Sequence, residues 1–155
     1  MKRNNQITGN IGMYFACYEL SRLGLNVLPT SRNAKGADIV AYTSNQEHFL
    51  TFQVKTLSKL SNISLGKTLE LGRSDWWIVV IDAYDTPTAF ILTPDEVRQS
   101  ARLYDGNYWA QGKELDREVT RNAWDRILSS IHASSADRGT STPTPFPAKL
   151  ESEPM

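Results

Sequence analysis

The chain has 155 residues, of which 40% are hydrophobic and 22% charged, and its formal net charge is zero. These values are typical of one globular domain with a hydrophobic core, and the length excludes two substantial domains. The single cysteine, Cys17, excludes an internal disulfide framework and a cysteine-based zinc cluster, so we expect a reducing, cytoplasmic environment.

Neither a membrane span nor a signal peptide is expected. No apolar run approaches the roughly 18 residues that cross a bilayer. The N-terminal residues are polar and lack the apolar segment of a signal peptide. We therefore expect no membrane partner.

Charge is unevenly distributed along the chain. Residues 1–74 contain nine lysines and arginines and four acidic residues, whereas residues 75–155 contain eight and thirteen. This asymmetry is compatible with a polyanionic partner held against one face. Charges that are simply solvated would give the same composition, so both interpretations stay open.

The first part of the chain predicts one helix followed by three strands. Apolar residues at helical spacing indicate a helix over residues 9–23, which Thr8 would cap and Gly24 would end. Short runs rich in β-branched and aromatic residues indicate strands over residues 25–29, 37–42 and 48–56.

The middle of the chain predicts a loop, two strands and a helix. Residues 57–74, rich in serine and glycine, indicate a loop excursion with short extended pieces. Residues 76–82 are a near-continuous apolar run, typical of a strand covered on both faces, so we expect its two tryptophans in the core. A partner strand follows at 88–92, and Thr93 begins a capping box for a helix that runs to about residue 103.

The C-terminal part predicts a last helix over residues 121–132 and then a tail. Residues 133–155 are rich in serine, threonine and proline and have almost no apolar periodicity, so we expect them to be disordered. The expected organisation is therefore one domain, residues 1–132, followed by this tail. The order of elements predicts an α/β domain around a mixed sheet.

Three polar residues in the predicted strands are the candidate site. Alternate side chains of a strand share a face, so Gln53 and Lys55 point the same way, while Val54 points into the opposite layer. If the two strands pair through a turn near residues 44–47, Asp38 comes alongside them. A carboxylate, an amide oxygen and an ammonium would then meet at one sheet edge, a set that can hold a divalent cation beside a phosphate.

Simpler interpretations of the same residues remain. Asp38 alone would serve equally well as a turn cap at the start of a strand, whereas Lys55 inside an apolar strand needs a partner or a role. The basic residues Arg32, Lys35 and Lys59 suit phosphate contacts. A solvated surface explains them equally well.

Several segments together resemble the PD-(D/E)xK nuclease superfamily. They are the helix start Gly9-Asn10-Ile11-Gly12, the strand 26–29, the strand Gly36-Ala37-Asp38-Ile39-Val40, the strand Gln53-Val54-Lys55-Thr56 and the strand start Ser74-Asp75-Trp76-Trp77. The resemblance is closer to the small Holliday-junction-resolvase-like and intron-endonuclease-like branches, in which Gln-x-Lys replaces Glu-x-Lys. It implies a restriction-endonuclease-like core, with a mixed central β-sheet flanked by helices.

The resemblance also implies roles for individual residues. Asp38 matches the metal-binding aspartate, and the side-chain oxygen of Gln53 or the neighbouring backbone carbonyl of Val54 would complete the shell of a Mg²⁺ or Mn²⁺ ion. Lys55 matches the lysine that positions the attacking water or stabilises the developing charge on the phosphorus. The glutamate that often follows the first-helix glycine is replaced by Met13, so Asp38 is expected to be the only anionic ligand unless an unplaced carboxylate joins it.

Two functions therefore stay open at the level of sequence. The first is a metal-dependent endonuclease that cuts duplex or branched DNA, with a homodimer as one arrangement. The second is a catalytically weakened relative that binds nucleic acid or a protein partner without cutting, including a regulator or inhibitor from a mobile element. The replacement by Met13 and the acidic second half of the chain favour the second function.

Overall fold

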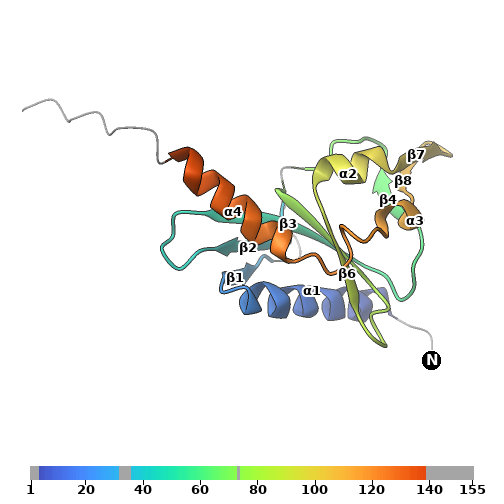
Figure 1. Cartoon of the computed structure of the whole chain (residues 1–155). Coiled ribbons are helices and arrows are strands. Elements are labelled where there is room, and N and C mark those ends of the chain that lie inside the picture. The colour runs from blue at the N-terminus through green and yellow to red at the C-terminus, as the bar shows by residue number, and fades with distance from the viewer. Residues whose placement is uncertain (1–3, 32–35, 73, 139–155) are drawn as a thin grey trace, which may run out of the picture.

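The computed structural model describes residues 4–31, 36–72 and 74–138 and shows two sheets with helices around them (Figure 1). In chain order, the elements are α1 (Asn5–Arg22), β1 (Asn26–Pro29), β2 (Ile39–Tyr42), β3 (Phe49–Thr56), β4 (Ile63–Gly66), β5 (Trp76–Ile81), β6 (Thr88–Leu92), α2 (Pro94–Gln99), β7 (Ala101–Tyr104), β8 (Asn107–Ala110), α3 (Gly112–Leu115) and α4 (Asp125–Arg138).

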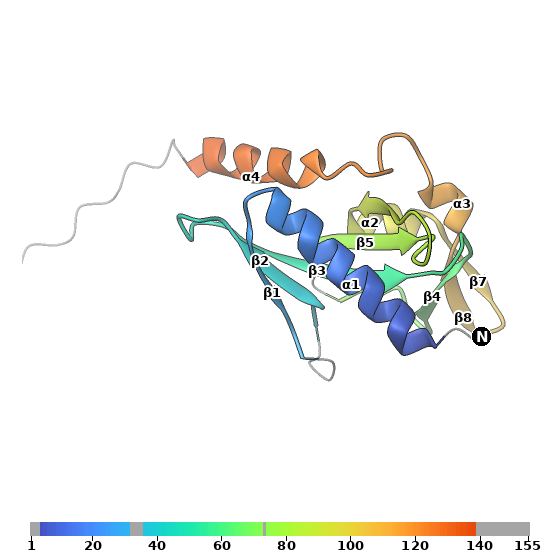
Figure 2. The same ribbon diagram turned by 90° about the horizontal axis from the view of Figure 1, so that it is seen from below.

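The larger sheet has five strands in the order β1-β2-β3-β5-β6. The pairs β1–β2, β2–β3 and β5–β6 are antiparallel, whereas β3 and β5 run parallel, so the sheet is mixed. The smaller sheet has three strands in the order β4-β8-β7 and lies to one side of the larger one (Figure 2). The predicted α/β fold with a mixed central sheet flanked by helices is confirmed.

Two hydrophobic cores lie on the two faces of the larger sheet. The first core joins α1 and α4 to the sheet through residues such as Ala16, Leu20, Phe52, Ile78 and Ile127. The second core joins α2, α3 and the smaller sheet to the opposite face. Strand β5 is buried along its whole length, as its apolar run predicts, because it contributes alternate residues to both cores.

Helix α1 begins earlier than the sequence predicts. Asn4 is the N-cap, and its side chain accepts a hydrogen bond from the Gln6 N–H at 2.8 Å. Thr8, predicted to be the cap, lies inside the helix, and its hydroxyl contacts the Asn4 carbonyl at 3.1 Å and the Tyr84 hydroxyl at 2.9 Å. The helix therefore extends by about one turn at its N-terminal end.

The smaller sheet accounts for a second difference from the sequence prediction. Thr93 and Glu96 form the predicted capping box, but α2 ends at Gln99 rather than near residue 103. The chain turns back between β7 and β8 at Asp105 and Gly106, whose φ angles are 47° and 72°. An Asp-Gly pair with both φ angles positive is a favoured two-residue hairpin turn, which explains the hairpin where a helix end was expected.

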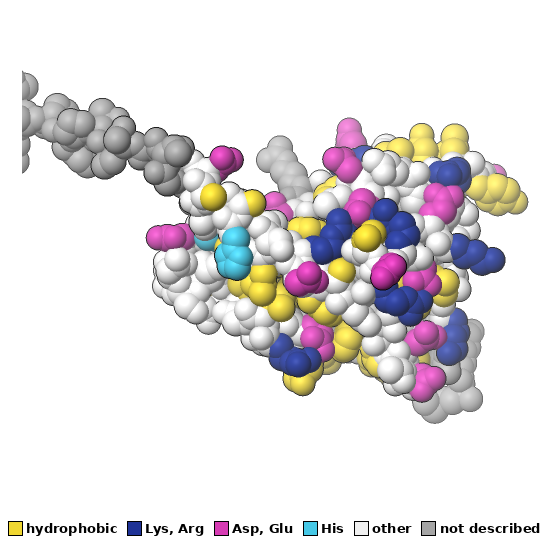
Figure 3. All heavy atoms as spheres, in the orientation of Figure 1, with side chains coloured by type: hydrophobic (Ala, Val, Ile, Leu, Met, Phe, Trp, Pro, Cys, Tyr) yellow, Lys and Arg dark blue, Asp and Glu magenta, His cyan; other side chains and the backbone are white. Residues whose placement is uncertain are grey.

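An ion-pair network connects α2 to α4 and to the segment that leads into it. The carboxylate of Glu96 lies 2.8 Å from Arg117 Nη2 and 3.0 Å from Arg126 Nη2. Burial opposes the ionisation of Glu96, but hydrogen bonds from Arg126, the Thr93 N–H and Arg117 outweigh it and hold its pKa below the usual range. Acidic and basic side chains are correspondingly interspersed over this face (Figure 3).

The C-terminal helix is longer than predicted. It starts at Asp125 rather than 121 and continues to Arg138, beyond the expected end at 132. The Ser135 hydroxyl lies 2.9 Å from His48 Nε2, which connects the end of α4 to the start of β3. The rest of the predicted tail, 139–155, lies outside the described residues. Within the described part of the chain, no helix is both long and apolar enough to cross a bilayer.

Candidate active site

The β2–β3 hairpin brings the three predicted residues to one face of the larger sheet. Ile39 pairs with Phe52 in the antiparallel ladder, so Asp38 lies opposite Gln53 one position further on. Opposite residues of antiparallel strands share a face, and Lys55 joins them because it lies two positions along β3. The chain reverses between the strands near Gln46, whose φ is 59°.

The Asp38 carboxylate is oriented by β3. Its Oδ2 accepts a hydrogen bond from the Val54 N–H at 2.8 Å and another from the Gln53 side-chain amide. The main chain of Asp38 is also fixed, since its N–H donates to the Phe52 carbonyl at 2.8 Å and its carbonyl accepts from Thr30 at 2.9 Å. Among the described residues, Oδ1 accepts no hydrogen bond, so this oxygen can bind a ligand.

The main-chain carbonyl of Val54 lies at the same edge. The N–H and C=O groups of one strand residue point to the same side of the strand. Because the Val54 N–H donates to Asp38, its carbonyl also points toward the side where β2 has ended. A second oxygen donor therefore lies beside the carboxylate.

Lys55 lies between this edge and the second core. Its ammonium lies over the ring of Trp77, 6.0 Å from the centroid, in the geometry of a cation–π contact. Trp77 is 4% exposed and therefore gives the ammonium a fixed neighbour. Within the described part of the chain, Lys55 forms no ion pair, so its charge is not neutralised by a protein carboxylate.

A cavity of 570 Å³ opens where these groups meet α1. Its walls come from the first half of α1, the end of β1, the residue before β2 and the end of β3: Gln6, Gly9, Asn10, Met13, Tyr14, Pro29, Thr30, Asp38, Val54, Lys55 and Thr56. Gln53 is not among them, but its side-chain amide donates a hydrogen bond to the Asp38 carboxylate. Asp38 and Lys55 therefore both border one shared space.

Close packing of α1 on β3 forms one side of this cavity. Gly12 is buried, and a Cβ atom built on it would lie 2.8 Å from Thr56 Cβ, closer than carbon atoms can approach. Only glycine allows the helix to come so near the strand. Met13, the next residue, consequently lines the cavity and also packs against the first core.

The oxygen donors of the site fit a single hard divalent cation. Within the described residues there is no group of three or more histidine, cysteine, aspartate or glutamate side chains. Mg²⁺ nevertheless needs only one or two carboxylates, since water and substrate phosphate supply the rest. Asp38 Oδ1 and the Val54 carbonyl can hold the ion, and Gln53 can add its amide oxygen after its amide group rotates to exchange NH₂ and C=O.

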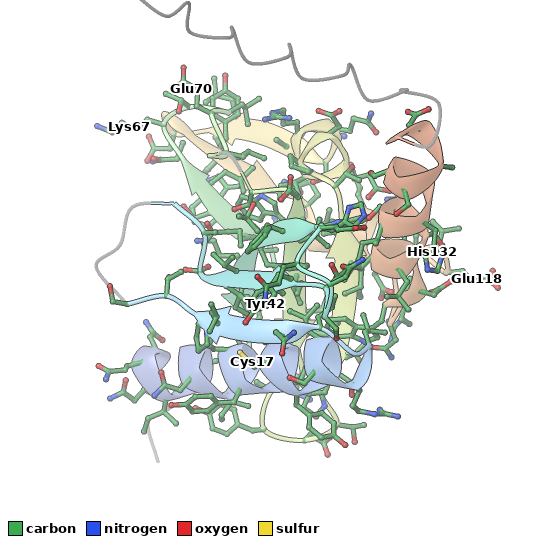
Figure 4. The ribbon with its side chains drawn as sticks, turned by 90° about the vertical axis from the view of Figure 1, so that its left-hand side faces the viewer. Cys17, Tyr42, Lys67, Glu70, Glu118 and His132 are labelled. Atoms are coloured by element: carbon green, nitrogen blue, oxygen red, sulfur yellow. The ribbon has the colours of Figure 1, made fainter. Side chains whose placement is uncertain are left out.

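Of the three predicted phosphate-binding residues, the structure describes only Lys59. Arg32 and Lys35 fall outside the described residues. Lys59 forms an ion pair with Asp82 at 2.9 Å and does not line the cavity. Lys67 lies on the far side of the larger sheet from α1 (Figure 4).

The expected core residues are found where the sequence predicts them. The tryptophans Trp76 and Trp77 are buried on opposite faces of the sheet. Cys17 lies on the side of α1 that faces the sheet (Figure 4), and burial raises the pKa of its thiol. This cysteine is therefore a packing residue and not part of the site.

Two features of the site were not found from the sequence. One is the contact of Gly12 with Thr56, for which the only signal was a glycine within a helix. The other is Tyr14, which is 67% exposed although it lines the cavity. Both depend on the distance between a helix and a strand, and no local pattern encodes that distance.

The mixed five-stranded sheet, with α1 packed against it, has a restriction-endonuclease-like fold. A bacterial homing endonuclease, I-Ssp6803I, has a similar structure, with a TM-score of 0.60 and 17% sequence identity over 86% of this chain and 98% of that one. This similarity identifies the fold and confirms the predicted fold class.

A weaker similarity is found to Hjc, a Holliday junction resolvase from Archaeoglobus fulgidus, with a TM-score of 0.42 and 16% identity over 66% of this chain and 89% of that one. No protein-family model matches the sequence. No curated protein is significantly similar to it.

Proposed function

We propose that this protein is a metal-dependent DNA endonuclease of the PD-(D/E)xK type. The observation that carries the proposal is that Asp38 and Lys55, which lie at neighbouring positions of the β2–β3 hairpin, both line one cavity. Hydrolysis of a phosphodiester needs at least two such groups: a carboxylate that can bind Mg²⁺ or Mn²⁺, and a nearby cation that can contact the phosphate.

Asp38 and the main chain of β3 would hold the ion. A divalent cation there supplies Lewis-acid stabilisation of the negative charge on the phosphate. The Val54 N–H, 2.8 Å from Asp38 Oδ2, keeps the carboxylate oriented while Oδ1 faces the ion. Gln53 donates to Asp38 without the ion, and its amide would rotate to present oxygen when the ion binds.

Lys55 would act on the phosphate itself. Lys55 lines the cavity, and its ammonium has no carboxylate partner among the described residues. Its positive charge could therefore stabilise the negative charge that develops on the phosphate during hydrolysis. Loss of one such preorganised donor reduces turnover by about 10²–10³-fold. Trp77 would limit the positions that the flexible lysine side chain adopts.

DNA is the proposed substrate because the site lies in the basic part of the chain. Arg32, Lys35 and Lys59 are proposed to contact the DNA backbone, which would make binding weaken steeply with salt. The similarity to a homing endonuclease supports DNA as the polymer. Cutting both strands of a duplex needs two active sites, which a homodimer would supply.

The test compares cleavage by Lys55→Ala with cleavage by a matched lysine variant. Supercoiled plasmid, linear duplex, branched and single-stranded DNA are incubated with Mg²⁺ or Mn²⁺, and the rate of cutting is measured. We expect cutting that EDTA stops, a loss of about 10²–10³-fold in Lys55→Ala, and an unchanged rate in Lys67→Ala, whose side chain is exposed away from the cavity. No cutting by the wild type, or equal rates in both variants, overturns the proposal.

A second function is supported by the chemistry of the cavity wall. Asp38 is the only carboxylate among the described residues that line the cavity, and Met13 occupies the position of the expected glutamate. Such a site would bind DNA but turn it over slowly or not at all. Binding that chelator leaves unchanged, with no cutting of any substrate, would support this alternative over the first.

A further inference from the structure

The described residues that α1 contributes to the cavity wall carry no charged side chain. The described residues of this wall include Gln6, with an amide, Met13, with a thioether, and Tyr14, with an aromatic ring. A metal ion or a phosphate gains little from such a wall. A nucleobase, in contrast, has flat faces that stack on aromatic rings and edges that pair with amides.

Tyr14 is available for such a contact. Its side chain is 67% exposed at the edge of the cavity, and among the described residues it has neither a hydrogen bond nor an aromatic or cationic partner. Tyr18, one turn further along α1, is similarly exposed at 60% but carries the Arg22 guanidinium 5.7 Å from its ring centroid. The two tyrosines thus differ in their distance from the cavity and in the occupancy of their rings.

The space beside Tyr14 is large enough for a base. The cavity volume of 570 Å³ falls within the range of about 300–1,000 Å³ found for small-molecule sites. Gly9 leaves the wall open, since a Cβ atom there would have no neighbour within 4 Å. A divalent ion and one phosphate group at Asp38 and Lys55 would leave the α1 side of this space unfilled.

We propose that the α1 wall binds one unstacked nucleobase, with Tyr14 stacked on its face, next to the phosphate at Asp38 and Lys55. The inference rests on the proposed function for the position of the phosphate, and it specifies the substrate class. The preferred DNA has a base that is already unpaired, as in a bulge, a mismatch, a branch point or a single strand. An intact duplex binds less well because a base must first leave the stack.

Binding without cleavage tests this inference. Two fluorescent oligonucleotides, a fully paired duplex and the same duplex with one bulged 2-aminopurine, are titrated with protein in EDTA at about 50 mM salt, where electrostatic binding is strong. We expect the wild type to prefer the bulged DNA by about 5- to 150-fold in Kd, the range of one base–aromatic stack. Quenching of 2-aminopurine should accompany binding, since the fluorophore stacks on the ring.

Variants of the two tyrosines separate stacking from other effects. Tyr14→Ala should lose both the preference and the quenching, Tyr14→Phe should keep them because the ring remains, and Tyr18→Ala should behave as the wild type. Thermal melts of each variant confirm folding. A wild type without preference or without DNA binding, or a Tyr14→Ala variant that keeps the preference, overturns the inference. Failure of metal-dependent cutting overturns the proposed function alone, because these titrations do not require it.

Discussion

One added methyl group at position 12 should destabilise the protein. A Cβ atom on Gly12 would lie 2.8 Å from Thr56 Cβ and 2.6 Å from its Cγ2, whereas non-bonded carbons prefer about 3.5–4.0 Å. Rotation of the threonine does not relieve the overlap, since its Cβ atom takes part. Overpacking costs about 1–3 kcal/mol, and the overlap with a main-chain-bonded atom places Gly12→Ala near the upper value.

The gain in helix propensity from glycine to alanine offsets about 1 kcal/mol of this cost. The expected net loss is therefore about 2 kcal/mol, or about 4–8 °C in Tm for a chain of this size. Urea and thermal unfolding of purified variants measure it. Because the contact forms one side of the cavity, a displacement of about 1 Å should also reduce cutting by about 10²-fold.

Gly9→Ala is the matched control for this prediction. It lies on the same helix, but its added Cβ would have no neighbour within 4 Å, so it should gain up to about 1 kcal/mol from helix propensity. Thr56→Gly should partly restore the stability of the Gly12→Ala variant, because it removes the side chain that the added Cβ would overlap. A Gly12→Ala protein as stable as the wild type, or equal losses in the two alanine variants, would show that the helix does not touch the strand there.

Three further predictions concern charge and burial. Gln53→Glu places a second carboxylate beside Asp38, so it should lower Tm in EDTA and bind Mn²⁺ at least about tenfold more tightly in calorimetry; equal affinities would mean that this side chain does not reach the ion. The pKa of Glu96 is lowered in the folded state, so its ionised form stabilises the fold at pH values above 4.5, the ordinary pKa of glutamate. This contribution is lost as the pH falls through the lower folded pKa, because the unfolded state takes up the proton first. Glu96→Gln should therefore flatten the acid side of the urea-midpoint profile, and an unchanged profile would exclude this network as its cause. The raised pKa of the Cys17 thiol should make its alkylation at pH 8 slower than in the urea-unfolded chain, and equal rates would contradict its burial.

Much of the larger sheet could be predicted from the sequence. Strand β2 alternates between buried and half-buried residues, and β5 is buried along its whole length, as their runs of β-branched and aromatic residues predict, so local pattern and tertiary position agree. The same alternation placed Gln53 and Lys55 on one face. The approach of Asp38 then followed from hairpin pairing, for which a polar turn was visible near residues 44–47.

The remaining elements depend on contacts that local pattern does not encode. The hairpin over residues 101–110 mixes arginine, tyrosine and tryptophan without clear alternation, and only its Asp-Gly pair marked the turn. The end of α4 is rich in serine and alanine, which are weakly patterned, yet Ser135 meets His48 across the fold. The position of Tyr14 at the cavity likewise depends on how closely α1 approaches β3.

The polar set at the sheet edge belongs to neither hydrophobic core, although both cores meet the strands that carry it. Changes to the chemistry of this edge therefore need not weaken the packing that holds the domain together. Substitutions at positions such as 53 would then alter the charge of the cavity without removing an apolar contact of either core. In this protein the residues of the proposed site and the residues that stabilise the fold are therefore largely different sets.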